Sequence, residues 1–203
     1  MSSRFDRFKR EVLNLPNMIT IGRLFMIPPV LLLIDRSDPF KCLIAMLLFM
    51  IASALDIADG WLARRRGLVT VFGKFMDPLA DKIMVMALLV YLVADGRVPA
   101  WIVVLLLARE FYISGLRLIA ANERVVIAAG PGGKAKTAFQ LVGICFILVH
   151  YQYRMPLLGG DSLDFGVVGF WLLMLSIVMS YYSALEYTVL FGQGMANRAA
   201  DAS

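Results

Sequence analysis

The chain has 203 residues, of which 60% are hydrophobic and only 17% are charged. This apolar share lies far above that of soluble domains, so the composition excludes an ordinary water-soluble enzyme and predicts an integral membrane protein. The formal net charge is +5, but no basic stripe with interleaved aromatic residues lies outside the apolar runs, and a nucleic-acid partner is therefore not expected.

The N-terminal segment is basic and amphipathic. Phe5, Phe8 and Val12 fall on one face at helical spacing, and Lys and Arg residues surround them. Such a pattern is typical of a helix in the interface of an anionic leaflet. Residues 1–14 are therefore predicted to form a short interfacial helix in contact with membrane lipids.

Six apolar runs follow, each approaching the roughly 20 residues that a helix needs to cross a bilayer. They cover about 15–34, 40–56, 77–94, 99–121, 138–153 and 165–191. A turn is predicted at 35–39, and the short fifth run could begin earlier, near Lys134. We expect one all-α membrane domain over 1–203, with the interfacial helix at 1–14, a six-helix bundle at 15–192 and a polar tail at 193–203.

The first run carries a polar stripe. Pro16 suits the start of a helix, and Asn17, Thr20 and Arg23 then recur at every third position. This spacing places the three polar side chains on one helical face.

The stretch from Asp56 to Asp81 holds four carboxylates. Asp56 and Asp59 are three residues apart, Asp77 and Asp81 are four apart, and each pair therefore shares a helical face. The arginines and glycines between the pairs predict a turn, so the flanking helices should run antiparallel with their acidic faces able to meet. Four ionised carboxylates repel one another, and hard divalent cations are the partners that carboxylate oxygens prefer. A structural role, with the acids solvated or paired to nearby arginines, is the alternative.

Further charges lie in and after the fourth run. Arg109 and Glu110 are adjacent and should point in different directions on a helix, so each is expected to need its own partner. The cations Arg109, Arg117, Lys134 and Lys136 together are typical of a phosphate pocket beside a metal–carboxylate cluster. Snorkelling of the long basic side chains to lipid headgroups is the alternative.

Two other polar residues are less informative. His150, the only histidine, is expected to be a hydrogen-bonded interfacial residue rather than a metal ligand. Glu186 could pack against the acidic cluster or cap the bundle, and the sequence does not choose between these roles.

Charge asymmetry predicts the orientation. The N-terminal segment, residues 64–82, residues 124–136 and the C-terminal tail hold most of the 20 Lys and Arg residues. Basic loops usually stay on the cytoplasmic face. Both termini and the four aspartates are therefore predicted to lie on that face.

The acidic stretch resembles a known family. The pattern Asp56-x₂-Asp59-Gly60-x₂-Ala63-Arg64-x₈-Gly73-x₃-Asp77-x₃-Asp81 resembles the complete signature of the CDP-alcohol phosphotransferases. Further segments are similar to bacterial phosphatidylglycerophosphate synthases: Pro16-Asn17-x₂-Thr20-x₂-Arg23, Arg109-Glu110, Ser114-Gly115-Leu116-Arg117 and Gly133-Lys134-x-Lys136-Thr137-x₂-Gln140. Those enzymes join the phosphatidyl group of CDP-diacylglycerol to sn-glycerol 3-phosphate and release CMP.

The resemblance implies a homodimer of six transmembrane helices in the bacterial cytoplasmic (inner) membrane, with two Mg²⁺ or Mn²⁺ ions. It implies that Asp56, Asp59 and Asp77 are metal ligands and that Asp81 is both a ligand and the base for the acceptor hydroxyl. The residues implied to bind CDP-diacylglycerol are Gly60, Ala63, Arg64, Thr70, Gly73, Asn17, Thr20 and Arg23. Those expected to bind glycerol phosphate are Arg109, Arg117 and Lys134.

Several alternatives stay open at this point. Within the same chemistry the acceptor could be serine, an inositol phosphate or phosphatidylglycerol. A divalent-cation transporter would use similar acids, but it predicts them near the bilayer midplane, on broken helices with related halves. A membrane prenyltransferase also uses metals and diphosphates, but its acidic motifs lie on widely separated helices.

Overall fold

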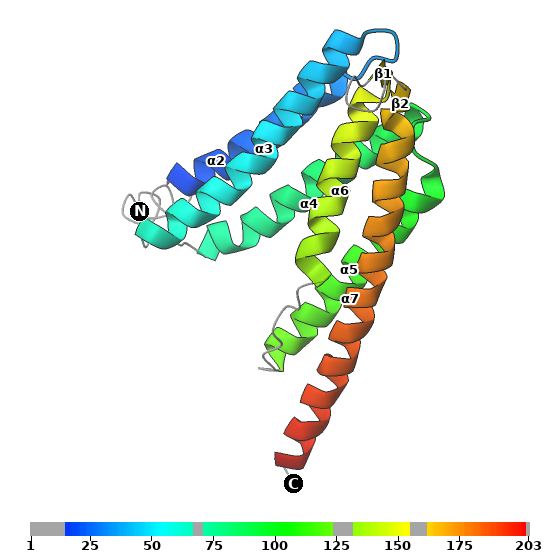
Figure 1. Ribbon diagram of the computed structural model, residues 1–203. Helices are drawn as coiled ribbons and strands as arrows, with labels where there is room; N and C mark the ends of the chain where they lie inside the picture. Colours follow the sequence, from blue (N-terminus) through cyan, green and yellow to red (C-terminus); the bar gives the residue numbers. More distant parts are fainter. Residues whose placement is uncertain (1–14, 67–70, 124–131, 155–161, 202–203) are drawn as a thin grey trace. The chain divides into compact units, whose positions relative to one another are not determined.

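The structure is a computed structural model and describes every residue except 1–14, 67–70, 124–131, 155–161 and 202–203 (Figure 1). The predicted interfacial helix and Thr70 therefore lie outside the described residues. So do several side chains within helices, among them those of Asp56, Asp59, Ala63, Arg64, Asp77 and Lys134. What is described is nearly all α-helical, which confirms the predicted all-α class.

Six helices and two short strands make up the described chain. They are α2 (Leu15–Leu32), α3 (Pro39–Arg66), α4 (Val71–Ala94), α5 (Ala100–Asn122), α6 (Gly132–Val149), β1 (Gln152–Arg154), β2 (Ser162–Asp164) and α7 (Phe165–Asp201). Each helix overlaps one of the six predicted apolar runs. Helix α6 begins at Gly132, as the short fifth run allowed.

Two predicted boundaries are wrong. The polar tail expected from residue 193 continues α7 as far as Asp201, because no proline or β-branched run interrupts it. Residues 152–154, expected in the fifth helix, form β1, which pairs antiparallel with β2. Strands of three residues are too short to produce a periodic signal in the sequence.

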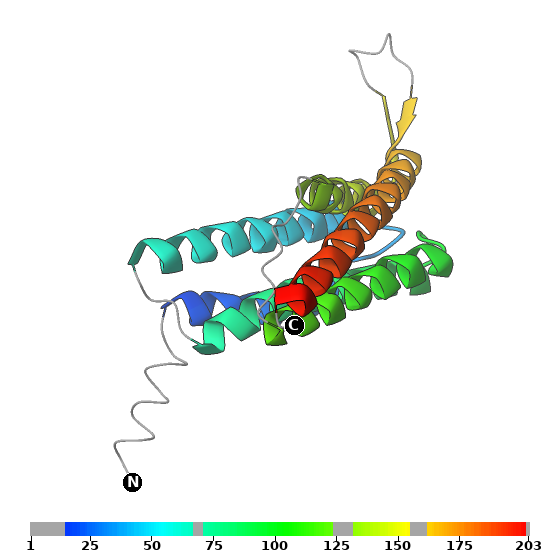
Figure 2. The same cartoon turned by 90° about the horizontal axis from the view of Figure 1, so that it is seen from below.

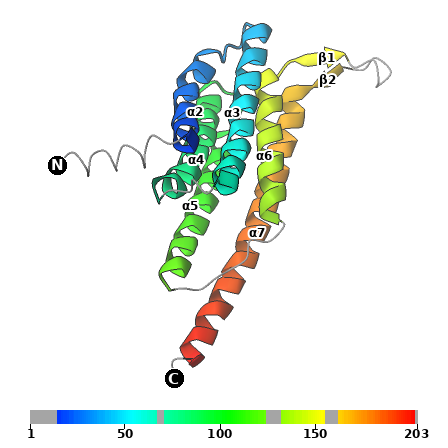
Figure 3. The ribbon, with the colours of Figure 1, turned by 90° about the vertical axis from the view of Figure 1, so that its left-hand side faces the viewer.

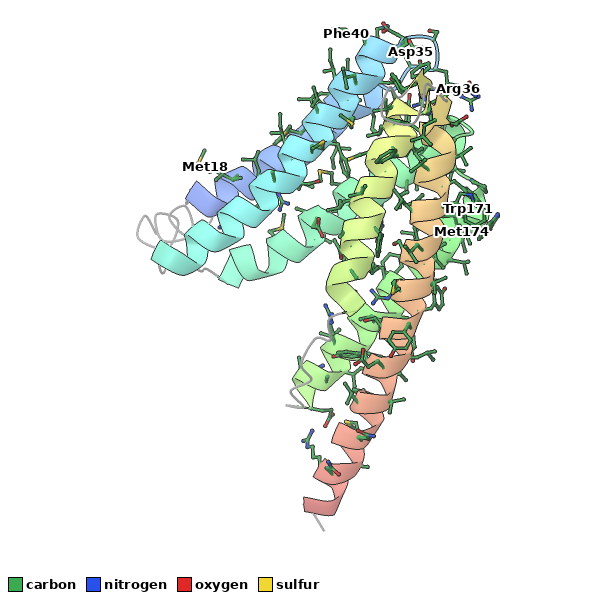
Figure 4. All side chains as sticks on the ribbon, viewed as in Figure 1. Met18, Asp35, Arg36, Phe40, Trp171 and Met174 are labelled. Atoms are coloured by element: carbon green, nitrogen blue, oxygen red, sulfur yellow. The ribbon has the colours of Figure 1, made fainter. Side chains whose placement is uncertain are left out.

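The hydropathy of the helices is compatible with a membrane protein. Among the described residues, Phe165–Arg198 is long and apolar enough to cross a bilayer, and shorter apolar helical segments lie at Asn17–Leu32, Pro39–Leu55 and Ala135–Val149. Large apolar side chains also lie on the outside of the helices, including Met18, Phe40 and Trp171 (Figure 4). The number of spans stays a prediction.

The chain forms two compact units, Met1–Asp95 and Gly96–Ser203. In the first unit, α2 packs against both α3 and α4 (Figures 1 and 3). The fully buried Ala45 and Ala52 of α3 are small residues of the kind that lets helix backbones approach closely. Helix α2 is therefore the element that holds the acid-bearing helices together.

The turn between α2 and α3 is built by two aspartates. Asp35 Oδ1 accepts hydrogen bonds from the backbone N–H and the hydroxyl of Ser37, at 2.9 and 2.6 Å. Asp38 Oδ1 accepts from the backbone N–H groups of Phe40 and Lys41, at 3.0 and 3.2 Å. Asp38 therefore caps α3, and Pro39 takes the first helical position, where its missing N–H costs nothing. The turn predicted at 35–39 is confirmed (Figure 4).

The Asp35 carboxylate should make this turn sensitive to acid. Its hydrogen bonds with Ser37 and its contact with Lys41 lower the pKa from 3.8 to about 2. A lowered pKa in the folded state means that the stabilisation is present above pH 4 and is lost as the pH falls from about 4 to 2. We expect Asp35→Asn to lower the Tm at pH 7 by about 1–2 °C, the scale of an exposed contact. Thermal unfolding in detergent at pH 7, 4 and 2 should show the Tm difference between the wild type and Asp35→Asn becoming smaller as the pH falls. A Tm difference that stays constant would contradict the assignment.

In the second unit, α6 lies alongside α7 for most of its length, and α5 also packs against α7. The closest approach of α6 and α7 is at a pair of glycines. A Cβ atom on Gly169 would lie 2.7 Å from the carbonyl oxygen of Gly143 and 2.5 Å from Cγ1 of Ile147. The absence of side chains at this crossing lets the two backbones touch.

The C-terminal end of α6 is hydrogen-bonded by an arginine. Arg97 donates to the carbonyl of Leu148 at 2.7 Å and to Nδ1 of His150 at 2.8 Å. A cation at these last carbonyls complements the negative end of the helix dipole. His150 has a φ of 27° and precedes the β1–β2 hairpin, which extends beyond the start of α7 (Figure 2). The expectation of a hydrogen-bonded histidine is confirmed.

Candidate active site

The polar stripe of α2 is buried within the first unit. Asn17, Thr20 and Arg23 are 2%, 0% and 2% exposed, and each of them makes an interaction within the structure. Since α2 packs against α3 and α4, the stripe belongs to the interior of this unit. An arginine buried among apolar helices is stable only with polar or anionic partners, so a charged centre is expected beside it.

The four aspartates lie on the two helices that α2 supports. Asp59 lies seven residues before the last residue of α3, and Asp77 lies six residues after the first residue of α4. Asp56 and Asp81 each lie ten residues from those same ends. At 1.5 Å per residue, Asp59 and Asp77 each lie about 10 Å along the helix axis from these ends. Asp56 and Asp81 each lie about 15 Å from them. Helix α4 runs back from the end of α3 (Figure 1), so the acid pairs occupy corresponding parts of two successive helices.

Small residues share the helical faces of the acids. On α3, Asp56 and Asp59 occupy one face with Gly60 and Ala63, at offsets of 3, 4 and 7 residues from Asp56. On α4, Gly73, Asp77 and Asp81 follow one another at intervals of four. These offsets place each set along one side of its helix. Because glycine has no Cβ, a ligand could approach the backbone beside the acids.

The donor set fits hard divalent ions. It consists of carboxylates without sulfur or imidazole, which favours Mg²⁺ or Mn²⁺ over Zn²⁺. Among the side chains that the structure describes, no three His, Cys, Asp or Glu residues gather into a metal-binding group. Of the four aspartates, Asp81 alone has a side chain that the structure describes. That side chain is half-buried and makes an interaction within the structure.

The second unit contains a charged network that joins three helices. Glu110 Oε2 on α5 accepts hydrogen bonds from Lys136 Nζ of α6 at 2.5 Å and from Arg109 Nη1 at 3.2 Å. Arg109 Nε donates to the carbonyl oxygen of Ser180 on α7 at 3.0 Å. The expectation that Arg109 and Glu110 each need a partner of their own is confirmed, because Arg109 bonds to the Ser180 carbonyl and Glu110 to Lys136. The two side chains also bond directly to each other.

The other predicted glycerol-phosphate residues have different surroundings. Arg117 is exposed on α5, with its guanidinium 5.7 Å from the centre of the Tyr187 ring. Arg109 lines a groove of about 330 Å³ between α5 and α7. Lys136 is 8% exposed, so it does not snorkel. The sequence placed Lys136 among the candidate phosphate-pocket residues but assigned no role to Glu110, because no periodicity connects residues on different helices.

Comparisons with known proteins agree with the acidic signature. The family model described as CDP-alcohol phosphatidyltransferase matches residues 13–182. The CDP-diacylglycerol–glycerol-3-phosphate 3-phosphatidyltransferase of Bacillus subtilis (strain 168) is 42% identical over 149 residues, covering 68% of this chain and 77% of the relative. The protein of the same name from Rickettsia bellii (strain RML369-C) is 38% identical over 136 residues, covering 67% and 75%.

A third relative carries a related name. The probable phosphatidylglycerophosphate synthase of Mycobacterium tuberculosis (strain ATCC 25618 / H37Rv) is 40% identical over 139 residues, covering 67% of this chain and 66% of the relative. The family model spans most of the chain, including all four aspartates and the polar stripe of α2. The chain therefore belongs to the CDP-alcohol phosphatidyltransferase family.

Proposed function

We propose that this protein transfers the phosphatidyl group of CDP-diacylglycerol to sn-glycerol 3-phosphate, giving phosphatidylglycerophosphate and CMP in anionic phospholipid synthesis. Membership of the family supports the reaction, and the names of the relatives support the donor and the acceptor. The single observation that carries the proposal is the position of the two aspartate pairs, six to ten residues from the end of α3 and from the start of α4.

The reaction needs one proton transfer and one displacement at phosphorus. Asp81 takes the proton of the 1-hydroxyl of glycerol phosphate, and the oxygen attacks the β-phosphorus of CDP-diacylglycerol. A new P–O bond forms, and the bond to CMP breaks. Asp56, Asp59, Asp77 and Asp81 would hold two divalent ions, which neutralise the diphosphate and stabilise the leaving group when bound.

The nucleotide end of the donor is assigned to the small and basic residues near the acids. Gly60, Ala63 and Gly73 leave space beside the backbone, and Arg64 supplies charge for the diphosphate. Thr70 and the buried face of α2, which carries Asn17, Thr20 and Arg23, complete this proposed pocket. Burial of that polar face supports the assignment, because it is the buried polar surface that packs against both acid-bearing helices.

Arg109, Arg117 and Lys134 are proposed to bind the dianionic phosphate of the acceptor. Since each cation contributes to acceptor binding and not to donor binding, we expect Arg117→Ala or Lys134→Ala to raise the KM for glycerol phosphate about tenfold, the effect of one lost charge-assisted contact. The KM for CDP-diacylglycerol should stay within about twofold, which steady-state kinetics in mixed micelles would measure. An unchanged acceptor KM in both variants would remove these residues from the site.

The proposal includes a position in the membrane. Six spans would place both termini and the aspartates on the cytoplasmic face of a bacterial inner membrane, in a homodimer. The concentration of Lys and Arg in alternate connections supports this orientation. The long apolar segment of α7 supports membrane insertion.

The decisive experiment measures CMP release by the purified protein with CDP-diacylglycerol, Mg²⁺ and sn-glycerol 3-phosphate. Serine, an inositol phosphate and phosphatidylglycerol serve as competing acceptors in parallel reactions. Release with glycerol phosphate alone is the expected result. Release with another acceptor would keep the reaction and replace the acceptor, while folded, metal-loaded protein that is inactive with all four would favour cation transport.

A further inference from the structure

The contact between Arg97 and His150 joins two parts of the second unit that are far apart in the sequence. Arg97 lies just before α5, and its Nη1 atom donates to the carbonyl oxygen of Leu148 at 2.7 Å and to Nδ1 of His150 at 2.8 Å. The carbonyl oxygen of Ile147 lies at 3.4 Å from the same atom. Helices α5 and α6 each pack chiefly against α7. Arg97 is therefore a direct link between the beginning of α5 and the end of α6.

This contact is compatible with only one protonation state of the imidazole ring. A guanidinium group donates hydrogen bonds and cannot accept them, so Nδ1 of His150 is the acceptor. A ring nitrogen accepts only when it carries no proton, and the ring is therefore neutral with its proton on Nε2. A second proton at Nδ1 would remove the acceptor and place an imidazolium beside the guanidinium. Because like charges at this distance repel each other, the contact would open.

The backbone at His150 indicates that its side chain has a specific role. His150 follows the last residue of α6 and has a φ of 27°. Glycine is the usual residue at this position of a helix end, because a Cβ atom is strained at positive φ. Glycine would relieve the strain, but it would offer Arg97 no acceptor. The imidazole therefore supplies a contact that the residue best suited to this backbone could not make.

The charged and titratable groups that adjoin His150 keep their charge between pH 5 and 8. The ring of Tyr151 lies with its centroid 4.2 Å from that of His150, and tyrosine is ordinarily neutral over this range. Asp164 of β2 lies close to His150, since a Cβ atom on Gly166 would be 3.1 Å from Asp164 Oδ1 and 3.7 Å from His150 Cβ. Aspartate is ordinarily ionised over the same range. Asp164 therefore offers a protonated ring an anionic alternative to Arg97.

The neighbouring helix ends add no group that titrates in this range. The last turn of α6 and the first turn of α7 consist of uncharged residues. Asp95, two residues before Arg97, is paired with Arg36 at 3.8 Å. Histidine is the side chain whose charge ordinarily changes between pH 5 and 8. Of the groups named around this contact, His150 is therefore the one that responds to mild acid.

We propose that the Arg97–His150 contact is an acid-sensitive latch: it holds the start of α5 to the end of α6 and the base of the β1–β2 hairpin while the imidazole is neutral, and it opens when the ring binds a proton. Because the bond needs the neutral ring, its stabilisation is present at pH 8 and is lost as the pH falls toward 5. In the proposed orientation, the acid that opens the latch comes from the side of the membrane opposite the cytoplasm. The latch itself does not depend on the proposed reaction.

The first test follows the imidazole ring by NMR. His150 is the only histidine, so the untagged protein labelled with ¹⁵N-histidine gives one pair of ring signals. At pH 8 the spectrum should show a proton on Nε2 and a hydrogen-bonded, unprotonated Nδ1. Arg97→Met removes the donor, so it should shift the Nδ1 signal at pH 8 and leave the signals at pH 5 unchanged. An Nδ1 signal at pH 8 that does not respond to Arg97→Met would overturn the proposal.

The second test measures opening by hydrogen exchange of backbone N–H groups. The reporters are the N–H of His150, which bonds to the Phe146 carbonyl at 2.9 Å, and that of Phe165, which bonds to the Tyr151 carbonyl at 3.2 Å. After correction for the intrinsic exchange rate at each pH, wild-type protection should be about tenfold lower at pH 5 than at pH 8. A loss of that size corresponds to one hydrogen bond to a charged group.

His150→Asn is the matched variant for this measurement. The Oδ1 atom of asparagine lies as many bonds from the backbone as Nδ1 of histidine and accepts a hydrogen bond without titrating. Asparagine also tolerates positive φ. We expect equal protection at both pH values in His150→Asn and weak protection at both in Arg97→Met, with Tm values at pH 8 showing that each variant folds. Wild-type protection that is independent of pH, or an equal loss at pH 5 in His150→Asn, would contradict the latch.

Discussion

Asp81→Asn protein is expected to release CMP at about one thousandth of the wild-type rate or less, while it still folds. The substitution removes a general base, worth about 10²–10⁴ in rate. It also weakens a proposed metal site by replacing a charged oxygen with an amide. The measurement is CMP release at saturating concentrations of both substrates and Mg²⁺. Residual activity above about one tenth would exclude Asp81 as the base.

A matched aspartate just beyond the same helix provides the control. Asp95 immediately follows the last residue of α4 and lies 3.8 Å from Arg36 in an ion pair. Asp95→Asn makes the same chemical change outside the acidic signature, so its rate should equal that of the wild type. A comparable loss in both variants would indicate that carboxylates on this helix act through stability rather than through the reaction.

Gly169→Ala is expected to have the largest effect on stability. The added Cβ would lie 2.5 Å from Ile147 Cγ1, 2.7 Å from the Gly143 carbonyl oxygen and 2.8 Å from the Ile147 nitrogen. Two of these atoms belong to the backbone of α6 and cannot rotate away, so α6 and α7 must separate. Overpacking of this kind costs about 1–3 kcal/mol or more, which corresponds to a fall in Tm of several degrees for a chain of this size.

A second glycine on the same helix supplies the comparison. No described atom lies within 4 Å of a Cβ built on Gly192, and alanine has the higher helix propensity. Gly192→Ala should therefore leave the Tm unchanged or raise it slightly. Thermal unfolding of both variants in the same detergent measures the difference. Equal Tm values for the two variants would show that the α6–α7 crossing tolerates a methyl group.

The polar residues of the first unit show which features of the fold could be predicted from the sequence. The polar stripe of α2 could be predicted because a spacing of three residues places its side chains on one helical face, whatever their partners. The acid pairs could be predicted in the same way, since Asp56 and Asp81 lie on regular helices at the expected positions. Both patterns are local, and helical spacing does not depend on how the helices pack against one another.

The errors have a common origin in contacts between segments distant in the sequence. The β1–β2 hairpin arises because residues 152–154 find partners at 162–164, and neither strand is long enough to be recognised alone. The direct bond between Arg109 and Glu110 was not expected, because adjacent residues on an isolated helix point in different directions. It occurs because Ser180 of α7 and Lys136 of α6 draw both side chains to one place.

The amino-acid sequence by itself therefore determined the all-α class, the family and the candidate acids, because these depend on composition, helical spacing and a signature within 26 residues. Only the tertiary structure decided that two cations share the Glu110 carboxylate and that Gly169 touches the backbone of α6. The physical reason is that ion pairing and close packing depend on distances between helices. Those distances follow from how side chains of the whole unit fill space, and no single segment encodes them.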